Sequence, residues 1–69
     1  MRKIQISLAA ARVNAGLSQN DVVRELHVSK QTIVNWENGK SEPTISQARA
    51  LSDLYKMPLE FIFLPEKSN

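Results

Sequence analysis

The 69-residue sequence contains no cysteine and only one histidine, which excludes several kinds of site. Without cysteine the chain has neither disulfides nor thiolate ligands for zinc. His27 has no second histidine and no carboxylate cluster with which to bind a metal, so we predict an ordinary turn residue there. We therefore expect no metal site and no cofactor. The lack of cysteine also fits a reducing compartment, and we predict that the protein is cytoplasmic.

Glycines and long apolar runs are also scarce. The two glycines, Gly16 and Gly39, are 23 residues apart, which excludes a glycine-rich phosphate-binding loop. No serine has His and Asp partners at a recognisable spacing and no carboxylate pair suggests a cleft, so we predict that the protein is not an enzyme. No apolar run approaches the ~20 residues that span a bilayer, and Met1–Gln5 is not followed by the apolar stretch of a signal peptide. We expect neither a membrane segment nor a small-molecule ligand.

A chain of this length can form one domain, and its charges do little to assign it to a class. The net charge of +2 is common among soluble domains. Capping residues and helical spacing predict an all-α domain of five helices over residues 6–64, with terminal extensions at 1–5 and 65–69. In chain order the predicted helices are Ser7–Ala15, about eight residues after the Ser18 cap, Lys30–Asn38, a segment with a capping box of Thr44 and Gln47, and Pro58–Phe63. Lys3–Ile6 and Phe61–Leu64 are strand-like and can form short terminal strands.

The second and third predicted helices form the motif that indicates a function. Only His27 and Val28 separate the second helix from Ser29, the cap of the third, and this layout is typical of a helix-turn-helix that places its second helix in the major groove of DNA. The exposed face of that helix carries polar side chains suited to base edges. They are Lys30, Gln31, Thr32 and Asn35. Because amides can bind adenine bidentately and lysine can donate to guanine, we predict that these residues read bases.

Several short motifs resemble the phage repressor and Cro type of helix-turn-helix regulator. They are Gly16-Leu17-Ser18-Gln19, Val28-Ser29-Lys30-Gln31-Thr32-Ile33, Trp36-Glu37-Asn38-Gly39-Lys40, Glu42-Pro43, and Leu59-Glu60 with Ile62-Phe63. The resemblance extends from about Ile6 to Leu64, which is nearly the whole chain. It implies a lambda-repressor-like five-helix domain that binds double-stranded DNA, with a homodimer on a palindromic operator.

The resemblance also implies roles for individual residues. Val34 joins the base-reading positions, where it can contact a thymine methyl group. Arg12 and Glu37 match a buried salt bridge that ties the first helix to the third, and an unpaired buried charge would be costly. Gln19 matches a position that contacts a phosphate and braces the start of the third helix. The residues predicted to contact phosphates are Ser18, Gln19, Asn38 and Lys40.

Three positions depart from the family pattern. His27 and Lys56 stand where glycine is usual, so we expect both to adopt a left-handed conformation at some cost in stability. Phe61 stands where the family usually has a polar residue, and it has no obvious place in the core. A homodimer contact is therefore predicted at the end of the domain, while a place in the core stays an alternative. The residues of this candidate contact are Phe61, Phe63 and Leu64.

We predict a sequence-specific regulator of transcription that reads the major groove with the helix at 30–38 and acts as a repressor. Two other interpretations remain open. The first is a protein-interaction module such as an antitoxin, which would normally carry a further partner-binding segment. The second is the DNA-binding fragment of a longer regulator, with residues 64–69 as the start of a linker. Because the sequence starts at Met1, we expect a complete small regulator.

Overall fold

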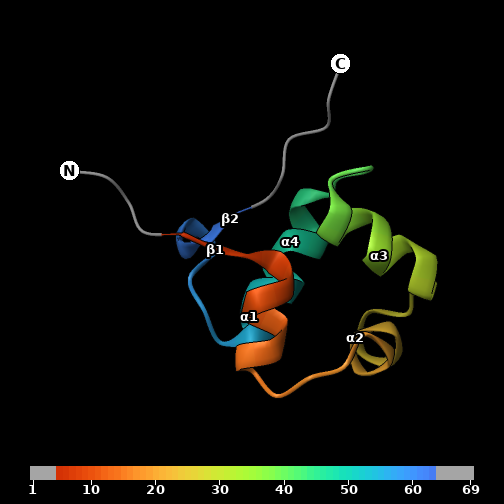
Figure 1. Ribbon diagram of the computed structural model, residues 1–69, viewed down its shortest axis with the longest axis horizontal. Coiled ribbons are helices and arrows are strands. Elements are labelled where there is room, and N and C mark those ends of the chain that lie inside the picture. The colour runs from red at the N-terminus through yellow and green to blue at the C-terminus, as the bar shows by residue number, and fades with distance from the viewer. Residues whose placement is uncertain (1–4, 64–69) are drawn as a thin grey trace.

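The computed structural model describes residues 5–63, and of Phe63 only the backbone. Within these residues, four α-helices and a two-stranded sheet make up the fold (Figure 1). In chain order the elements are β1 (Ile6–Ser7), α1 (Leu8–Asn14), α2 (Gln19–Leu26), α3 (Lys30–Asn38), α4 (Ile45–Tyr55), the 3-10 helix η1 (Leu59–Phe61) and β2 (Ile62–Phe63). The predicted third helix and the length of the second are confirmed.

Each α-helix begins after a hydroxyl side chain that caps its first turn. The hydroxyl oxygen accepts a hydrogen bond from the backbone N–H three residues later, at 3.0 or 3.1 Å. The capping residues are Ser7, Ser18, Ser29 and Thr44. At Thr44 the predicted capping box is complete, because Gln47 Oε1 accepts from the Thr44 backbone N–H at 2.8 Å. A cap of this kind contributes about 1 kcal/mol, so local sequence determines where the helices begin.

Two helices end at left-handed residues that are not glycine. His27 after α2 has a φ of 58°, and Lys56 after α4 has a φ of 53°, as the sequence predicted. Gly16 and Gly39 adopt the same conformation after α1 and α3 without strain. For a residue with a Cβ atom, the left-handed conformation costs about 1–2 kcal/mol. The ends of α2 and α4 are therefore sharp at the expense of stability.

The prediction of a fifth helix at Pro58–Phe63 is wrong. The described residues form four α-helices instead of the five expected for a lambda-repressor-like domain. Only a single 3-10 turn, η1, occurs there. Pro58 provides no side-chain cap, and the turn is held by a hydrogen bond of 2.9 Å from Phe61 N to Pro58 O. Ile62 then takes an extended conformation (φ −100°, ψ 123°), because it is buried and pairs with Ile6. Pairing with the other end of the domain thus stops the helix after one turn.

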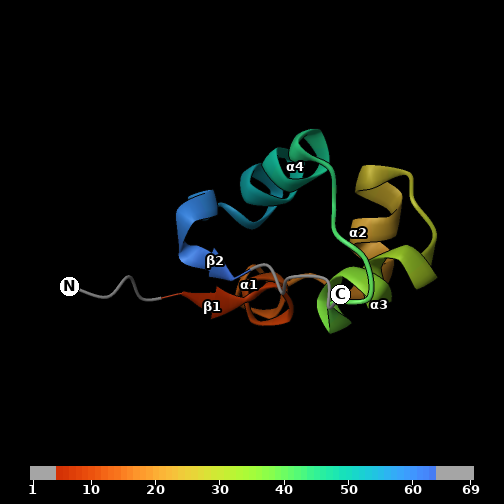
Figure 2. The same ribbon diagram turned by 90° about the horizontal axis from the view of Figure 1, so that it is seen from above.

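The short strands form a parallel pair that joins the two ends of the domain. Ile6 lies opposite Ile62 and Ser7 lies opposite Phe63, so the predicted strands form, in shortened form. Figures 1 and 2 both place this pair at one end of the domain and the α2–α3 unit at the other. The strand pair thus closes the domain at the end remote from the helix-turn-helix.

A single core anchors the four α-helices and β2. Its buried side chains, each at most 5% exposed, are Leu8, Ala11, Val22, Ile33, Trp36, Ala48, Leu51, Tyr55 and Ile62. Because both helices of the α2–α3 unit contribute to it, their inner faces are fixed and their other faces lie outward. Among residues 5–63, no helix has the length and apolar character required to cross a membrane.

Candidate nucleic-acid interface

The inner side of α3 determines which of its side chains can reach a ligand. Ile33 and Trp36 are buried in the core, with 1% and 3% exposure. Glu37 is also turned inward, and its side chain is 7% exposed. Since Glu37 is the one acidic residue of α3, the outer face of this helix carries no carboxylate.

The outer face of α3 carries four of the five residues predicted to read bases. Lys30 and Gln31 are exposed, and Val34 and Asn35 are half-buried. The amides of Gln31 and Asn35 are hydrogen-bonded to each other, with Gln31 Nε2 2.9 Å from Asn35 Oδ1. The face thus combines a cation, two coupled amides and an apolar group, which are the side-chain types that bind base edges in the major groove.

Thr32 has a different setting from the other four. It is half-buried, its backbone N–H donates to Ser29 Oγ, and its hydroxyl lies 2.8 Å from the Ser29 hydroxyl. Both bonds belong to the cap of α3. The structure therefore gives Thr32 a part in starting the helix, and its contact with bases stays a prediction.

At the start of α2, Ser18 and Asp21 form a capping box that engages the backbone N–H and the hydroxyl oxygen of Ser18. Asp21 Oδ2 accepts from the Ser18 backbone N–H at 2.8 Å, and Ser18 Oγ accepts from the Asp21 backbone N–H at 3.1 Å. The backbone N–H of Ser18, and after it the Ser18 hydroxyl, stabilise the charged carboxylate and hold the pKa of Asp21 below its ordinary value of 3.8; the charge of Arg24, which pairs with Asp21, acts in the same direction. The backbone N–H of Ser18 is thus engaged, and a contact of its hydroxyl with a phosphate stays a prediction.

A network around Glu37 ties α1, α2 and α3 together. The Glu37 carboxylate accepts from Arg12 Nε at 2.8 Å, from Arg12 Nη2 at 3.5 Å and from Gln19 Nε2 at 3.0 Å. Arg12, whose side chain is 14% exposed, also donates from Nη1 to the carbonyl of Leu17 at 2.9 Å. The ion pair that the resemblance implied is present in the structure. Four hydrogen bonds thus satisfy two largely buried charges.

The contact of Gln19 with this network differs from the sequence-based expectation. The resemblance implied that Gln19 braces the start of α3, whereas its amide donates to Glu37 in the last turn. This bond uses one N–H of the amide, and the second N–H can be donated to a phosphate. Sequence spacing could not reveal the contact, because the two residues are 18 positions apart and meet only after the helices pack.

Asn38 and Lys40 follow the outer face of α3 at its C-terminal end. Both are exposed. The chain turns sharply here, because Gly39 is left-handed, the Lys40 N–H donates to the Asn35 carbonyl at 2.8 Å and the Gly39 N–H donates to the Trp36 carbonyl at 3.3 Å. This pattern is a Schellman turn, which fixes the backbone on which the Lys40 side chain stands.

Tyr55 lies in the core and places a hydroxyl there without a partner. The residue is 4% exposed, and its hydroxyl makes no hydrogen bond with any part of the chain that the structure describes. Burial raises the pKa of Tyr55 to about 12, and the charge of Glu37 adds to the rise while that of Arg12 opposes it. No signal in the sequence indicated this unsatisfied group.

The candidate dimer contact is described in part. The side chain of Phe61 is 43% exposed on η1, at the end of the domain remote from α3 (Figure 1). The side chain of Phe63 and all of Leu64 lie outside the described residues. Phe61 thus has no place in the core, and its role in a dimer stays a prediction.

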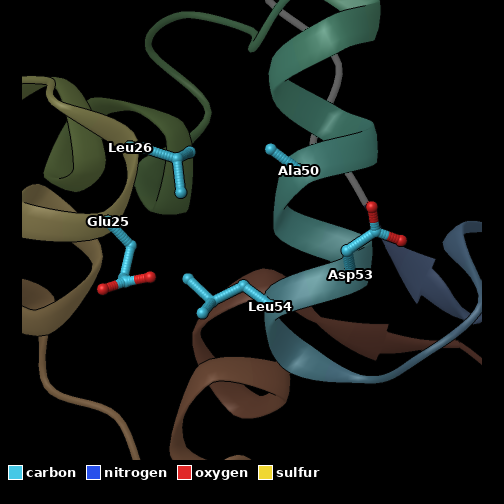
Figure 3. A pocket seen from close by; sticks show the side chains of 5 residues that line it. All are labelled: Glu25, Leu26, Ala50, Asp53 and Leu54. Carbon is cyan, nitrogen blue, oxygen red and sulfur yellow. The ribbon is translucent and has the colours of Figure 1, made fainter.

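A hollow between α2 and α4 carries acidic rather than basic side chains. Figure 3 shows Leu26 across from Ala50 and the Glu25 carboxylate beside Leu54, and the carboxylate of Asp53 stands on α4 next to Leu54 in the chain. Two carboxylates would repel DNA phosphates, so this surface lies outside the candidate interface. Residues 5–63 contain no group of three or more His, Asp or Glu that could hold a metal ion.

Comparison with known proteins agrees with this geometry. The profile of the helix-turn-helix family matches residues 8–62, from the first residue of α1 to β2. The chain belongs to the Cro/C1-type helix-turn-helix family. A relative with 36% identity over 50 residues is named an uncharacterised HTH-type transcriptional regulator of Methanocaldococcus jannaschii, and the match covers 72% of this chain and 76% of that protein. No solved structure matches the chain significantly.

Membership of this helix-turn-helix family confirms the resemblance on which the sequence-based prediction rested. Members of this kind bind DNA, and the matched residues include all four α-helices. The family assignment therefore makes the outer face of α3 the leading candidate for the DNA-binding surface.

Proposed function

We propose that this protein is a sequence-specific transcriptional regulator that reads the major groove of DNA with α3 and acts as a repressor. The observation that carries the proposal is the outer face of α3, where Lys30, Gln31 and Asn35 offer hydrogen-bonding groups and no carboxylate opposes them. The opposite side of the helix is anchored in the core, so the helix can enter the groove as a rigid body. The name of the relative supports a role in transcription.

Contacts to phosphates hold α3 in register on the duplex. Gln19 has its amide oriented by Glu37, and Lys40 carries a positive charge just after α3. The Ser18 hydroxyl and the Asn38 amide complete the predicted set. Such contacts carry no sequence information directly, so their loss weakens binding to all sequences alike. We expect Lys40→Ala to lower affinity uniformly and to reduce the salt dependence of binding by about one unit of slope.

A homodimer on a palindromic operator gives this arrangement its specificity. The η1 turn, which carries the exposed Phe61, lies at the end of the domain opposite α2 and α3 (Figures 1 and 2), so a dimer formed there leaves both α3 helices accessible. Two half-sites would lie about 34 Å apart, one turn of the double helix. Repression then follows because the bound dimer covers promoter DNA and excludes polymerase.

The dimer is tested by sedimentation of the parent and of Phe61→Glu. A charge on this exposed position should leave the fold intact and make the protein monomeric. Ile45→Glu is a matched control, since Ile45 is 74% exposed on α4 and is not part of the predicted contact. If Phe61→Glu sediments as a dimer like the parent, the assignment of Phe61 to the interface is wrong.

The reading of sequence is tested by selecting bound duplexes from a random library at two salt concentrations. The parent is compared with a triple variant, Lys30→Ala, Gln31→Ala and Asn35→Ala. We expect the parent to enrich an inverted repeat that the triple variant does not enrich, with weaker, salt-sensitive binding left in the variant. A matched control changes the acidic hollow instead, as Glu25→Ala with Asp53→Ala, and should enrich the same repeat as the parent.

The opposite result would redirect the assignment. If the parent enriches no sequence and binds duplex DNA no better than the triple variant, the regulator proposal is wrong. The fold would then have to serve as a protein-interaction module.

A further inference from the structure

The two amides on the outer face of α3 form one hydrogen-bonded unit. Gln31 and Asn35 are four residues apart, so their side chains are neighbours on one face of the helix. Gln31 donates from Nε2 to Asn35 Oδ1 at 2.9 Å. The direction of this bond matters, because a primary amide has two donor hydrogens and one acceptor oxygen.

The bond makes the two amides unequal toward DNA. Gln31 uses one N–H and keeps the other together with its carbonyl oxygen, which is the donor–acceptor pair that matches N7 and N6 of adenine. Asn35 accepts at its oxygen and keeps both N–H groups, which match the two acceptors of guanine, N7 and O6. Hydrogen bonds in a chain also polarise each other, so Gln31 becomes a better acceptor and Asn35 a better donor.

We infer that Gln31 and Asn35 act as a coupled reader, with adenine opposite Gln31 and guanine opposite Asn35. This inference rests on the proposed function, since it assigns bases to residues that must first reach the groove. Independent reading by two amides would instead favour adenine at both positions, because adenine is the usual bidentate partner of either side chain. The hydrogen bond between the two side chains thus changes the preferred base opposite Asn35 from adenine to guanine.

The coupling distinguishes this pair from Asn38, the third side-chain amide of α3. In the part of the chain that the structure describes, the bond of Gln31 is to Asn35 alone, and Asn38 has no hydrogen-bonded partner on the helix. Asn38 therefore provides a matched control with the same amide on the same helix.

The test measures the base preference at each operator position for four proteins, by selection from a library followed by affinity measurement on single-base variants. Asn35→Asp keeps the oxygen that accepts from Gln31 but has no donor. It should retain adenine opposite Gln31 and replace guanine by cytosine, whose N4 donates, with a change in relative affinity on the order of tenfold. Asn35→Ala removes the acceptor as well, so it should lose guanine and also weaken the preference for adenine at the neighbouring position. Asn38→Ala, which removes a predicted phosphate contact, should weaken binding to all sequences alike and leave the base preferences at both positions unchanged.

The outcomes separate this inference from the proposed function. If the parent selects an operator that depends on Gln31 and Asn35, but with adenine at both positions, the coupled reader is wrong and the regulator proposal stands. The same holds if Asn35→Ala relaxes one position only, or if Asn35→Asp does not exchange guanine for cytosine. If the parent selects no operator, the proposed function itself fails.

Discussion

Replacing Glu37 with alanine removes the acceptor at the centre of the network that joins three helices. The substitution breaks the hydrogen bonds from Arg12 Nε and from Gln19 Nε2, at 2.8 and 3.0 Å. Arg12 stays largely buried at 14% exposure and keeps only its bond to the Leu17 carbonyl. The variant therefore holds an uncompensated guanidinium beside the core.

The expected loss is a large part of the total stability. Removing one partner of a buried ion pair costs about 3–5 kcal/mol, whereas a 69-residue domain has a free energy of unfolding of roughly 3–10 kcal/mol in all. For a domain of this size, 1 kcal/mol shifts the melting temperature by about 4–8 °C. We therefore expect Glu37→Ala to lower the melting temperature by more than about 10 °C.

Thermal unfolding followed by circular dichroism measures this shift in melting temperature. Two further variants serve as controls for its cause. Glu25→Ala removes an exposed carboxylate that makes no ion pair within residues 5–63, so its effect should stay within about 0.5 kcal/mol. A double variant, Arg12→Met with Glu37→Leu, removes both charges and should recover most of the loss, since buried pairs can often be replaced by apolar groups. A Glu37→Ala melting curve that coincides with the parent's would refute the reasoning, as would a double variant less stable than Glu37→Ala.

Four other predictions concern stability. Lys56→Gly should relieve the left-handed strain after α4 and raise the free energy of unfolding by about 0.5–1 kcal/mol, a value that already subtracts the greater freedom of glycine in the unfolded chain. Lys56→Ala keeps the strain and should give no such gain in a denaturant titration. Tyr55→Phe should be as stable as the parent or more stable, because the hydroxyl lacks a partner in residues 5–63, and calorimetry showing a loss above about 1 kcal/mol would contradict this. The pKa of Tyr55, raised to about 12, also predicts that the parent loses stability as the pH rises from 10 to 12, since the tyrosine of the unfolded chain ionises first. The absorbance of this single tyrosine reports its titration, and Tyr55→Phe should not show this loss of stability. For Asp21, whose pKa is lowered, the stabilising contribution is present above 3.8 and is lost as the pH falls through the folded-state pKa. Asp21→Asn should therefore flatten the acid limb of the stability profile, and a profile that keeps the parent's acid limb would contradict this.

Local sequence determined most of the architecture and the polar face of α3 that forms the candidate interface. Hydroxyl caps and left-handed residues act within a few positions of each helix end, so the bounds of α2 and α3 followed from Ser18, Ser29 and Gly39. Helical periodicity placed Ile33 and Trp36 inside, and this left Lys30, Gln31 and Asn35 outside. The family motifs, which are also local, added the ion pair of Arg12 with Glu37.

Only the tertiary structure decided the features that depend on residues far apart in the chain. The sequence pattern at Pro58–Phe63 favours a helix, but Ile62 pairs with Ile6 in a strand instead. Burial of the Ile62 side chain in this strand stabilises the fold more than a helix of one or two turns would. Packing also brought the Gln19 amide to Glu37 rather than to the start of α3. The Gln31–Asn35 bond is local, but its direction depends on side-chain rotamers that spacing does not specify. Local chemistry thus determined the elements and their exposed faces, and packing determined how the polar groups on those faces are paired.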